Sequence, residues 1–284
     1  MDDPRQAWRE TLRDLGVMGL VPEPRSAASA PVATPAPEPA AAPRSRARGA
    51  AAAEPPAKVS VGAMAGPYAP PADPSACPAP GLVASAATLA ELEDRIKGCL
   101  ACPLGPGRLR FVFGEGDPKA RLMFVGEGPG RDEDLQGRPF VGKAGELLDR
   151  MIGAIGLARD QVYIANVVKC RPPDNRVPTG PEAAACLGYL RRQIELIAPS
   201  VIVTLGATPL RELVGEGAGI TRVRGQWRRV KVGDREIPVM PTFHPAYVLR
   251  QYTPEVRKAV WEDLKAAKAW LEGPGRLSPG AEPG

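Results

Sequence analysis

The sequence predicts an α/β domain: a three-layer α/β/α sandwich around a mainly parallel, four-stranded sheet, preceded by a disordered N-terminal extension. Two observations lead to this prediction. Four short runs are almost wholly apolar, as strands covered on both faces of a sheet must be. Helix-like stretches separate these runs, and this alternation is typical of parallel sheets. The predicted strands are Leu122–Val125, Val162–Val168, Val201–Leu205 and Ile237–Phe243.

Helix signals lie between and after these strands. Helical stretches are expected at 145–155, 181–197 and 208–214. Thr179, with a Glu three residues later, is a capping-box signature at the start of the second stretch. Thr253 precedes a Pro that begins the last helix. Ligands of such folds bind at the carboxyl ends of the strands, so the segments that follow the strands are expected to form the site.

Changes in composition divide the chain into four parts. Residues 1–20 predict a short amphipathic helix, because apolar residues recur at intervals of three or four. This helix either docks on a protein partner or on the main domain, or has no fixed partner. Residues 21–82 are rich in Pro and Ala and predict a disordered linker, since they cannot bury enough apolar surface to offset their ordering entropy. The folded domain is expected over 83–273, and a disordered tail over 274–284.

The charge balance is mildly basic. The 284 residues carry a formal net charge of +5 and a pI near 9.0. This charge permits a nucleic-acid partner without requiring one. The N-terminus shows no secretory signal, and no apolar run is long enough to span a bilayer. We therefore expect a cytoplasmic monomer with no membrane partner.

Four cysteines predict a metal centre. Cys99 and Cys102 form a C-x-x-C pair, and Cys170 and Cys186 follow far downstream. In a reducing compartment, clustered cysteines are more often metal ligands than disulfides. Four thiolates suit either a tetrahedral zinc or an iron–sulfur cluster, and their spacing does not choose between the two. The alternative is one redox pair plus two ordinary buried cysteines. Cys77, within the Pro/Ala-rich stretch, is expected to take no part.

Two glycine-rich segments follow the first predicted strand. The turn at 126–130 lacks the third glycine of a dinucleotide-binding loop, and Pro129 removes a backbone donor where a phosphate would lie. A tight turn that lets the backbone approach a flat ligand is the preferred interpretation. Phe140 lies on a second loop flanked by glycines. It is placed either to stack on a planar ring or to fill the core.

Polar residues at the other strand ends suggest base recognition. Asn166 lies within an apolar strand, where its amide must be satisfied, and an amide complements an N–H beside a C=O on a pyrimidine edge. His244, the only histidine in the chain, follows the fourth strand, where a catalytic donor is expected. The arginine-rich segment 221–229 either follows a phosphate backbone or forms a solvated turn.

In this order, the segments resemble the family-4 uracil-DNA glycosylases, the iron–sulfur branch of the uracil-DNA glycosylase superfamily. The resemblance covers about 92–271. It is carried by the cysteine spacing and by four motifs. The motifs are Gly126–Gly130 with Glu133 and Asp134, Arg138–Gly142, Asn166 ahead of Lys169–Pro173, and His244–Ala246.

The resemblance implies a role for each pocket residue. Phe140 would stack on a flipped uracil, and Asn166 would read its N3–H and O4. Glu127 would lie beside C5, where it excludes the methyl group of thymine, and His244 would contact O2. Gly128 stands where the best-known branch of the superfamily has an Asp that orients water.

Because of Gly128, the residue that positions water is expected to be Glu127 or Glu133. The resemblance also implies a structural [4Fe–4S] cluster on the four cysteines. Uracil-containing DNA is the implied substrate, and its N-glycosidic bond would be hydrolysed to leave an abasic site in base excision repair. The alternatives are a catalytically silent iron–sulfur DNA-binding module and an electron carrier. The arginines expected to hold DNA phosphates are Arg224, Arg228 and Arg229.

Overall fold

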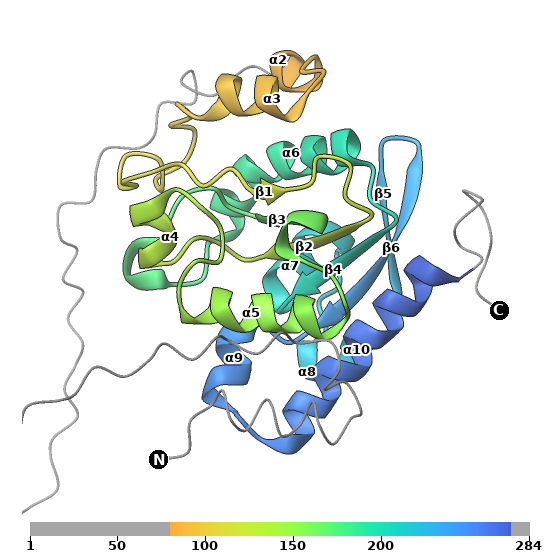
Figure 1. The fold of residues 1–284 in the computed structure, drawn as a ribbon. Coiled ribbons are helices and arrows are strands. Elements are labelled where there is room, and N and C mark those ends of the chain that lie inside the picture. The colour runs from red at the N-terminus through yellow and green to blue at the C-terminus, as the bar shows by residue number, and fades with distance from the viewer. Residues whose placement is uncertain (1–79, 274–284) are drawn as a thin grey trace, which may run out of the picture. The chain divides into compact units, whose positions relative to one another are not determined.

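The computed structural model describes residues 80–273, which form a sheet between two helical layers (Figure 1). The sheet has six strands among these residues, in the order β1-β3-β2-β4-β6-β5. The inner strands β3, β2, β4 and β6 are parallel, and the edge strands β1 and β5 pair antiparallel. The strands are β1 (Glu115–Gly116), β2 (Leu122–Gly126), β3 (Tyr163–Asn166), β4 (Val201–Leu205), β5 (Arg228–Val232) and β6 (Arg235–Thr242).

Nine α-helices and two short 3₁₀ turns complete the described residues. The helices are α2 (Pro80–Ala84), α3 (Leu89–Ile96), α4 (Arg131–Gln136), α5 (Lys143–Ala154), α6 (Gly180–Ile197), α7 (Ala207–Val214), α8 (Ile220–Val223), α9 (Pro245–Arg250) and α10 (Pro254–Glu272). The 3₁₀ turns are η2 (Arg159–Gln161) and η3 (Pro173–Asn175). None of these helices combines the length and the apolar run that a bilayer crossing needs.

The alternation of side chains along the inner strands creates the two cores. Leu122 and Phe124 of β2 face α5, α9 and α10, whereas Met123 and Val125 face α3, α6 and α7. Both sets are buried because helices cover both faces of the sheet (Figure 1). The predicted three-layer α/β architecture is therefore confirmed.

The four predicted strands are the four parallel strands of the sheet. The two edge strands were not predicted as strands, for two reasons. β1 is only two residues long. β5 alternates charged and apolar residues and occupies the end of the segment 221–229, whose start belongs to α8. The fold also begins earlier than predicted, because α2 starts at Pro80, inside the predicted linker. The predicted helix at 1–20 and the tail at 274–284 lie outside the described residues.

The capping box predicted at Thr179 is present. The Thr179 hydroxyl accepts from the Glu182 amide at 3.4 Å, and the Glu182 carboxylate accepts from the Thr179 amide at 2.8 Å. Arg176 donates to both carboxylate oxygens of Glu182, at 2.8 and 2.7 Å. These bonds fix the start of α6, the helix that carries Cys186.

The strand order places a crevice at one edge of the sheet. The chain runs from β2 to β3 on one side and then crosses to β4 on the other side. Ligands of open α/β sheets bind at such a switch point, outside the carboxyl ends of the strands. The inner strands end there at Gly126, Asn166, Leu205 and Thr242.

Arg224 has a structural role, and its predicted contact with a DNA phosphate stays a prediction. Its guanidinium forms two hydrogen bonds with the buried carboxylate of Asp263 and donates to the Ala259 carbonyl at 2.6 Å. Asp263 also accepts from the Thr242 hydroxyl at 2.7 Å. Arg224 therefore ties the end of α8 to α10 and to the end of β6. Removing one partner of a buried pair strands the other charge, so the arrangement is needed by the fold itself.

Candidate active site

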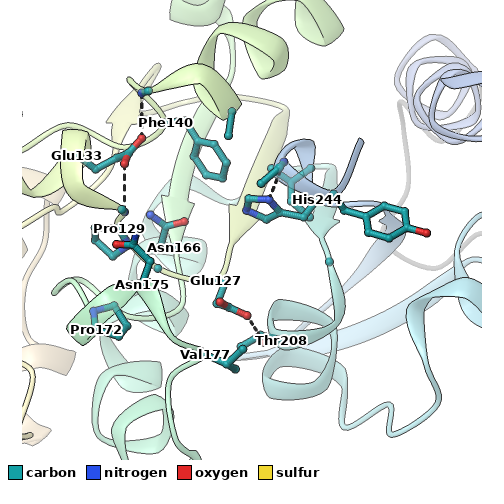
Figure 2. A pocket seen from close by; sticks show the side chains of 18 of the residues that line it. Glu127, Pro129, Glu133, Phe140, Asn166, Pro172, Asn175, Val177, Thr208 and His244 are labelled. Carbon is teal, nitrogen blue, oxygen red and sulfur yellow. Dashed lines mark hydrogen bonds between the residues drawn. The ribbon is translucent and has the colours of Figure 1, made fainter. Parts of the chain in front are cut away.

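A cavity of about 790 Å³ opens at the carboxyl ends of the four parallel strands. The ends of the strands and the segments that follow them supply its side chains. Glu127 follows β2, Asn166 ends β3, Thr208 follows β4 and His244 follows β6. Figure 2 shows these side chains and Phe140 around one common space. The structure therefore brings together pocket residues that lie far apart in the sequence.

The backbone of Phe140 is held in an unfavourable conformation. Its φ angle is 50°, in the left-handed region that bulky residues avoid, and such strain persists only where neighbouring groups enforce it. Glu133 supplies that restraint, because one carboxylate oxygen accepts from the amides of Val141 and Gly142 at 2.9 and 3.1 Å. The other oxygen accepts from the Gly130 amide at 3.1 Å. The ring is thereby aimed into the pocket.

These three bonds change the role expected for Glu133. Backbone amides occupy both oxygens of its carboxylate, so Glu133 shapes the loop around Phe140 and also holds the glycine-rich turn. A carboxylate used in this way has little hydrogen-bonding capacity left to orient a water molecule. Of the two residues expected to position water, Glu127 is the better candidate. Gly128 also lines the pocket, and a Cβ there would press on the Val168 side chain.

Glycine at position 126 allows the pocket floor to form. A Cβ at Gly126 would collide with the Phe140 ring and with the Oδ1 atom of Asn166. A Cβ at Gly145 would collide with the Phe140 carbonyl. The aromatic ring and the amide converge because neither glycine has a side chain.

Asn166 has an unpaired acceptor directed at the pocket. The residue is 1% exposed, and its Oδ1 has no hydrogen-bond partner among the described residues. A buried carbonyl without a donor carries a desolvation cost, so native proteins rarely keep one without a reason. A ligand with an N–H at this point would satisfy it.

His244 presents a neutral N–H donor. Its Nδ1 accepts from the Ala246 amide at 3.1 Å, so the proton of the neutral ring lies on Nε2. Burial of the ring lowers the pKa of His244 to about 4, and the positive charge of Arg250 acts in the same direction. The ring centroid lies 5.7 Å from that of Phe140. At neutral pH, therefore, the site offers an uncharged donor beside an aromatic face.

Glu127 is held by a hydrogen bond that crosses the crevice. The Thr208 hydroxyl, at the start of α7, donates to the Glu127 carboxylate at 2.5 Å. Thr208 is 4% exposed, so the bond is shielded from water. It joins the segments after β2 and β4, the two strands between which the crevice opens. The carboxylate is thus fixed in direction while it lines the pocket.

The four cysteines lie near one another and accept hydrogen bonds at sulfur. The Cys99 sulfur accepts from the Ala101 amide at 3.4 Å and from the Tyr189 hydroxyl at 3.1 Å. The Cys170 sulfur accepts from Arg108 at 3.5 Å. Backbone amides donate to the other two sulfurs. The donor–acceptor pairs are Leu104 and Gly105 to Cys102, and Lys169 to Cys186.

This environment suits thiolates bound to a metal centre better than free thiols. All four cysteines are free of disulfides, and their charges act on one another. Burial raises the pKa of Cys170 to about 11 and that of Cys186 to about 12, so without a metal these groups would be inert thiols. Donors aimed at sulfur tune and stabilise bound thiolates. The donor set therefore fits a sulfur-ligated centre.

The described residues contain no preformed single-ion site. Within 80–273, no group of three or more His, Cys, Asp or Glu side chains is placed to hold a single metal ion. A zinc would draw four sulfurs to within about 2.3 Å of one point. A cluster, whose irons lie apart, holds its thiolates more widely.

Basic residues at the pocket mouth differ from those predicted. Arg228 pairs with Glu216 at 3.1 Å and Arg229 with Glu236 at 3.2 Å, and neither residue lines the pocket. Their predicted contact with DNA stays a prediction. Five other cationic side chains line the cavity: Arg131, Lys143, Arg176, Arg211 and Arg250.

Comparison with known proteins agrees with this geometry. A model of the uracil DNA glycosylase superfamily matches residues 113–265. The chain belongs to this superfamily. The type-4 uracil-DNA glycosylase of Thermotoga maritima is 50% identical over 188 residues, which are 65% of this chain and 95% of that protein. The type-4 enzyme of Sulfurisphaera tokodaii is 48% identical over 196 residues, or 67% of this chain and 88% of that protein. The type-4 enzyme of Archaeoglobus fulgidus is 44% identical over 182 residues, or 63% and 90%.

Some pocket residues of this superfamily member are absent from the sequence prediction. Thr208 follows β4, so the rule that sites form after strands would have found it. Asn175 also lines the pocket, from a turn in which it and Asp174 both have φ angles above 50°. The signal there was the Pro-Pro-Asp-Asn run, which is typical of a turn. We call the five cationic side chains that line the cavity the cationic rim. No local sequence pattern predicts them as a group, because they come from separate segments of the chain.

The pKa of His244 gives a direct test of the site. Because the chain has one histidine, a ¹⁵N NMR titration should show only the two ring-nitrogen signals of one imidazole. Its pKa should be about 4 rather than the ordinary value near 6.5, with the proton on Nε2 between pH 6 and 8. The reason is that burial disfavours the charged ring. A midpoint near 6.5, or a proton on Nδ1, would contradict the geometry described here.

Proposed function

We propose that this protein is a uracil-DNA glycosylase, which flips uracil out of DNA and hydrolyses its N-glycosidic bond to leave an abasic site for base excision repair. The observation that carries the proposal is the unpaired Oδ1 of Asn166, at the floor of a pocket flanked by Phe140 and His244. Its type-4 relatives support the same activity. The orientation of Asn166 and His244 also disfavours a catalytically silent module.

Base recognition follows from the match between the hydrogen-bonding edge of uracil and the side-chain amide of Asn166. Uracil offers an N3–H donor beside the O4 acceptor, so Asn166 accepts from N3–H through Oδ1 and donates to O4 through Nδ2. Cytosine presents an acceptor and a donor in the same places and leaves the amide mispaired. Phe140 stacks on the base. A base can reach this pocket only after it leaves the duplex stack.

Bond cleavage places negative charge on the leaving base and positive charge on the sugar. The Nε2–H of His244 is available to donate to O2 as that charge develops. Because the imidazole is neutral, it stabilises the anion by donating a hydrogen bond and keeps its proton. A donor of this kind is typically worth about 100-fold or more in rate.

Glu127 has two proposed tasks. It lies beside the base, where its carboxylate excludes the 5-methyl group of thymine. It also orients the water that attacks the sugar, because Thr208 occupies one carboxylate oxygen and fixes the direction of the other. With Gly128 in place of a water-orienting Asp, we assign this task to Glu127, whose carboxylate lines the pocket beside Gly128.

We also propose that Cys99, Cys102, Cys170 and Cys186 hold a [4Fe–4S] cluster. The hydrogen bonds to the sulfurs support a sulfur-ligated centre, and the family resemblance makes that centre an iron–sulfur cluster. Hydrolysis transfers no electrons, so the cluster supplies no chemistry and serves to brace the fold. It would join the loop after α3, the segment after β3 and helix α6.

The phosphates of DNA are assigned to the cationic rim. Arg131, Lys143 and Arg250 are exposed at the pocket mouth and form no hydrogen bond or ion pair with another described residue. By contrast, Arg176 and Arg211 are paired with Glu182 and Glu212. Free cations beside the pocket are suited to positioning the backbone that flanks a flipped base. A cytoplasmic location, a monomeric state and a protein partner for residues 1–20 remain proposals from the sequence.

The activity is tested on an oligonucleotide with one uracil. The wild type should release free uracil and leave an alkali-labile site. Asn166→Ala should lower kcat/KM by about 10- to 100-fold, because the loss of a buried hydrogen-bond partner costs about 1–3 kcal/mol. Asn166→Asp should gain weak activity on cytosine. Gln136→Ala, which removes an exposed side-chain amide outside the pocket, is the control and should stay within about threefold. Wild-type turnover by Asn166→Ala would remove the base-reading role.

The cluster is tested by metal content. Protein purified without oxygen should be brown, with about four irons and matching sulfide per chain. Cys170→Ser should lose iron and stability together, since a ligand is gone. Cys77→Ser should keep both and serves as the control. Stoichiometric zinc without iron would show that the cluster assignment is wrong.

The cationic rim is tested by the salt dependence of DNA binding. Arg131→Gln and Lys143→Gln should each flatten the slope of log K against log salt by about one unit, because each removes one phosphate contact. Arg229→Gln should leave the slope unchanged, since Arg229 is paired with Glu236 away from the pocket. A flatter slope for Arg229→Gln alone would restore the assignment made from the sequence.

A further inference from the structure

Lys169 is fully buried, which is rare for a lysine. Its side chain is 0% exposed. Its Nζ donates to the Asn166 carbonyl at 2.9 Å and to the Gln193 side-chain oxygen at 2.5 Å. None of the ion pairs within 80–273 involves Lys169, so no carboxylate compensates its charge. Burying an amine without a carboxylate is costly, and such a group is kept only where other interactions require it.

The backbone of Lys169 touches the cysteine centre. The residue directly precedes Cys170, and its amide donates to the Cys186 sulfur. Burial lowers the pKa of the Lys169 amine to about 8, and the nearby Cys186 and Cys170 act in the opposite direction. The Lys169 carbonyl accepts from the Val112 amide at 2.9 Å. One residue therefore contacts a ligand on α6, adjoins a ligand after β3 and reaches back to the end of β3.

Gln193 fixes the direction of this side chain. The Gln193 amide nitrogen donates to the Phe113 carbonyl at 3.0 Å and to the Tyr163 hydroxyl at 3.4 Å. Its oxygen must then face Lys169. The Nζ atom is thus held between helix α6 and the carbonyl of Asn166, whose own side chain carries the unpaired acceptor of the pocket.

We propose that Lys169 is a positioning residue that couples the metal centre to the base-reading amide of Asn166. The inference rests on the proposed function of the pocket and of the cysteines. Asn166 is the last residue of β3. Beyond it, the Val167 and Val168 amides donate to the Gly126 and Glu127 carbonyls at 2.9 and 3.2 Å, so Nζ of Lys169 is the donor that acts on the Asn166 carbonyl from the side of the cysteines. The hydrogen bond from Nζ to the Asn166 carbonyl closes the short segment 166–169 into a ring. The far end of this segment is held beside Cys170 and Cys186. This segment sets the direction of the amide that meets the base.

The test compares Lys169→Met with Lys169→Arg. Met has a similar length and no donors, whereas Arg keeps donors and charge. Lys258→Met, an exposed lysine on α10, is the control. Each protein is assayed for iron content, for the inhibition constant of free uracil and for the affinity for DNA with an abasic site. Turnover on a uracil oligonucleotide is a fourth measurement.

Lys169→Met should retain iron but bind free uracil about tenfold more weakly and lose kcat by a similar factor, because misdirected groups at a site cost this much or more. Its affinity for abasic DNA should stay at the wild-type value, since the cationic rim is intact. Lys169→Arg should recover part of the uracil affinity, and Lys258→Met should match the wild type. An unchanged uracil affinity in Lys169→Met would overturn the proposal. Equal loss of iron and uracil binding would also overturn it, because Lys169 would then only stabilise the cluster.

A measurement on the wild type decides the case if Lys169→Met does not fold. In ¹⁵N-lysine-labelled protein, one side-chain Nζ signal should be protected from solvent exchange, because the Lys169 amine is fully buried and donates to two acceptors. The absence of such a signal would overturn the placement of Lys169. If the wild type releases no uracil, the proposed function fails. The iron content and this signal would still report on Lys169 separately.

Discussion

The register between β2 and β3 is the constraint on which the site depends. It pairs Gly126 with Asn166 at the ends of two parallel strands. A shift of one residue would turn every side chain of β3 to the opposite face and would carry the amide away from the pocket. In the observed register, the missing side chain of Gly126 leaves room for both the Phe140 ring and the Asn166 amide. A base-sized recess with one aromatic and one polar wall follows from this pairing.

Two consecutive carboxylates support the aromatic wall from outside. Glu133 holds the loop around Phe140 through the amides of Val141 and Gly142. Its neighbour Asp134 is buried and accepts from the amides of Leu109 and Arg110 at 2.9 and 3.3 Å. Helix α4 therefore connects the segment that follows the C-x-x-C pair to the loop that carries Phe140. Rigid support of this kind keeps a site organised before its ligand arrives.

Most of the framework could be predicted from local patterns, because those patterns report on burial and on chain geometry. Apolar runs identified all four parallel strands, and the capping box identified the start of α6. Asn166 and His244 were found because a polar side chain at the end of an apolar strand lies where α/β sheets bind their ligands. The family resemblance supplied their roles, which the residues alone left open.

What could not be predicted are the partners of charged side chains. Arg224 was expected at a phosphate because it lies in an arginine-rich run, yet its partner Asp263 lies 39 residues away. Glu127 and Thr208 are 81 residues apart. A run of arginines in the sequence predicts an exposed, charged surface only if no buried carboxylate pairs with one of them. Whether such a carboxylate lies nearby depends on tertiary packing. For the same reason the cationic rim was missed, since its members meet only after the strands have aligned.

The pocket concentrates features that oppose folding. Phe140 occupies a strained conformation, Asn166 keeps an unpaired acceptor, and His244 stays neutral where an exposed ring would be charged at mildly acidic pH. The low pKa of His244 makes the stability of the fold depend on pH in one direction. The folded pKa of about 4 lies below the ordinary value near 6.5, so between these pH values the unfolded chain binds a proton that the folded protein refuses. Stability contributed by His244 is complete above pH 6.5 and is lost as pH falls toward 4. The two apolar cores on either side of the sheet must offset this loss. A neutral N–H donor in the pocket thus comes with a weaker fold in acid.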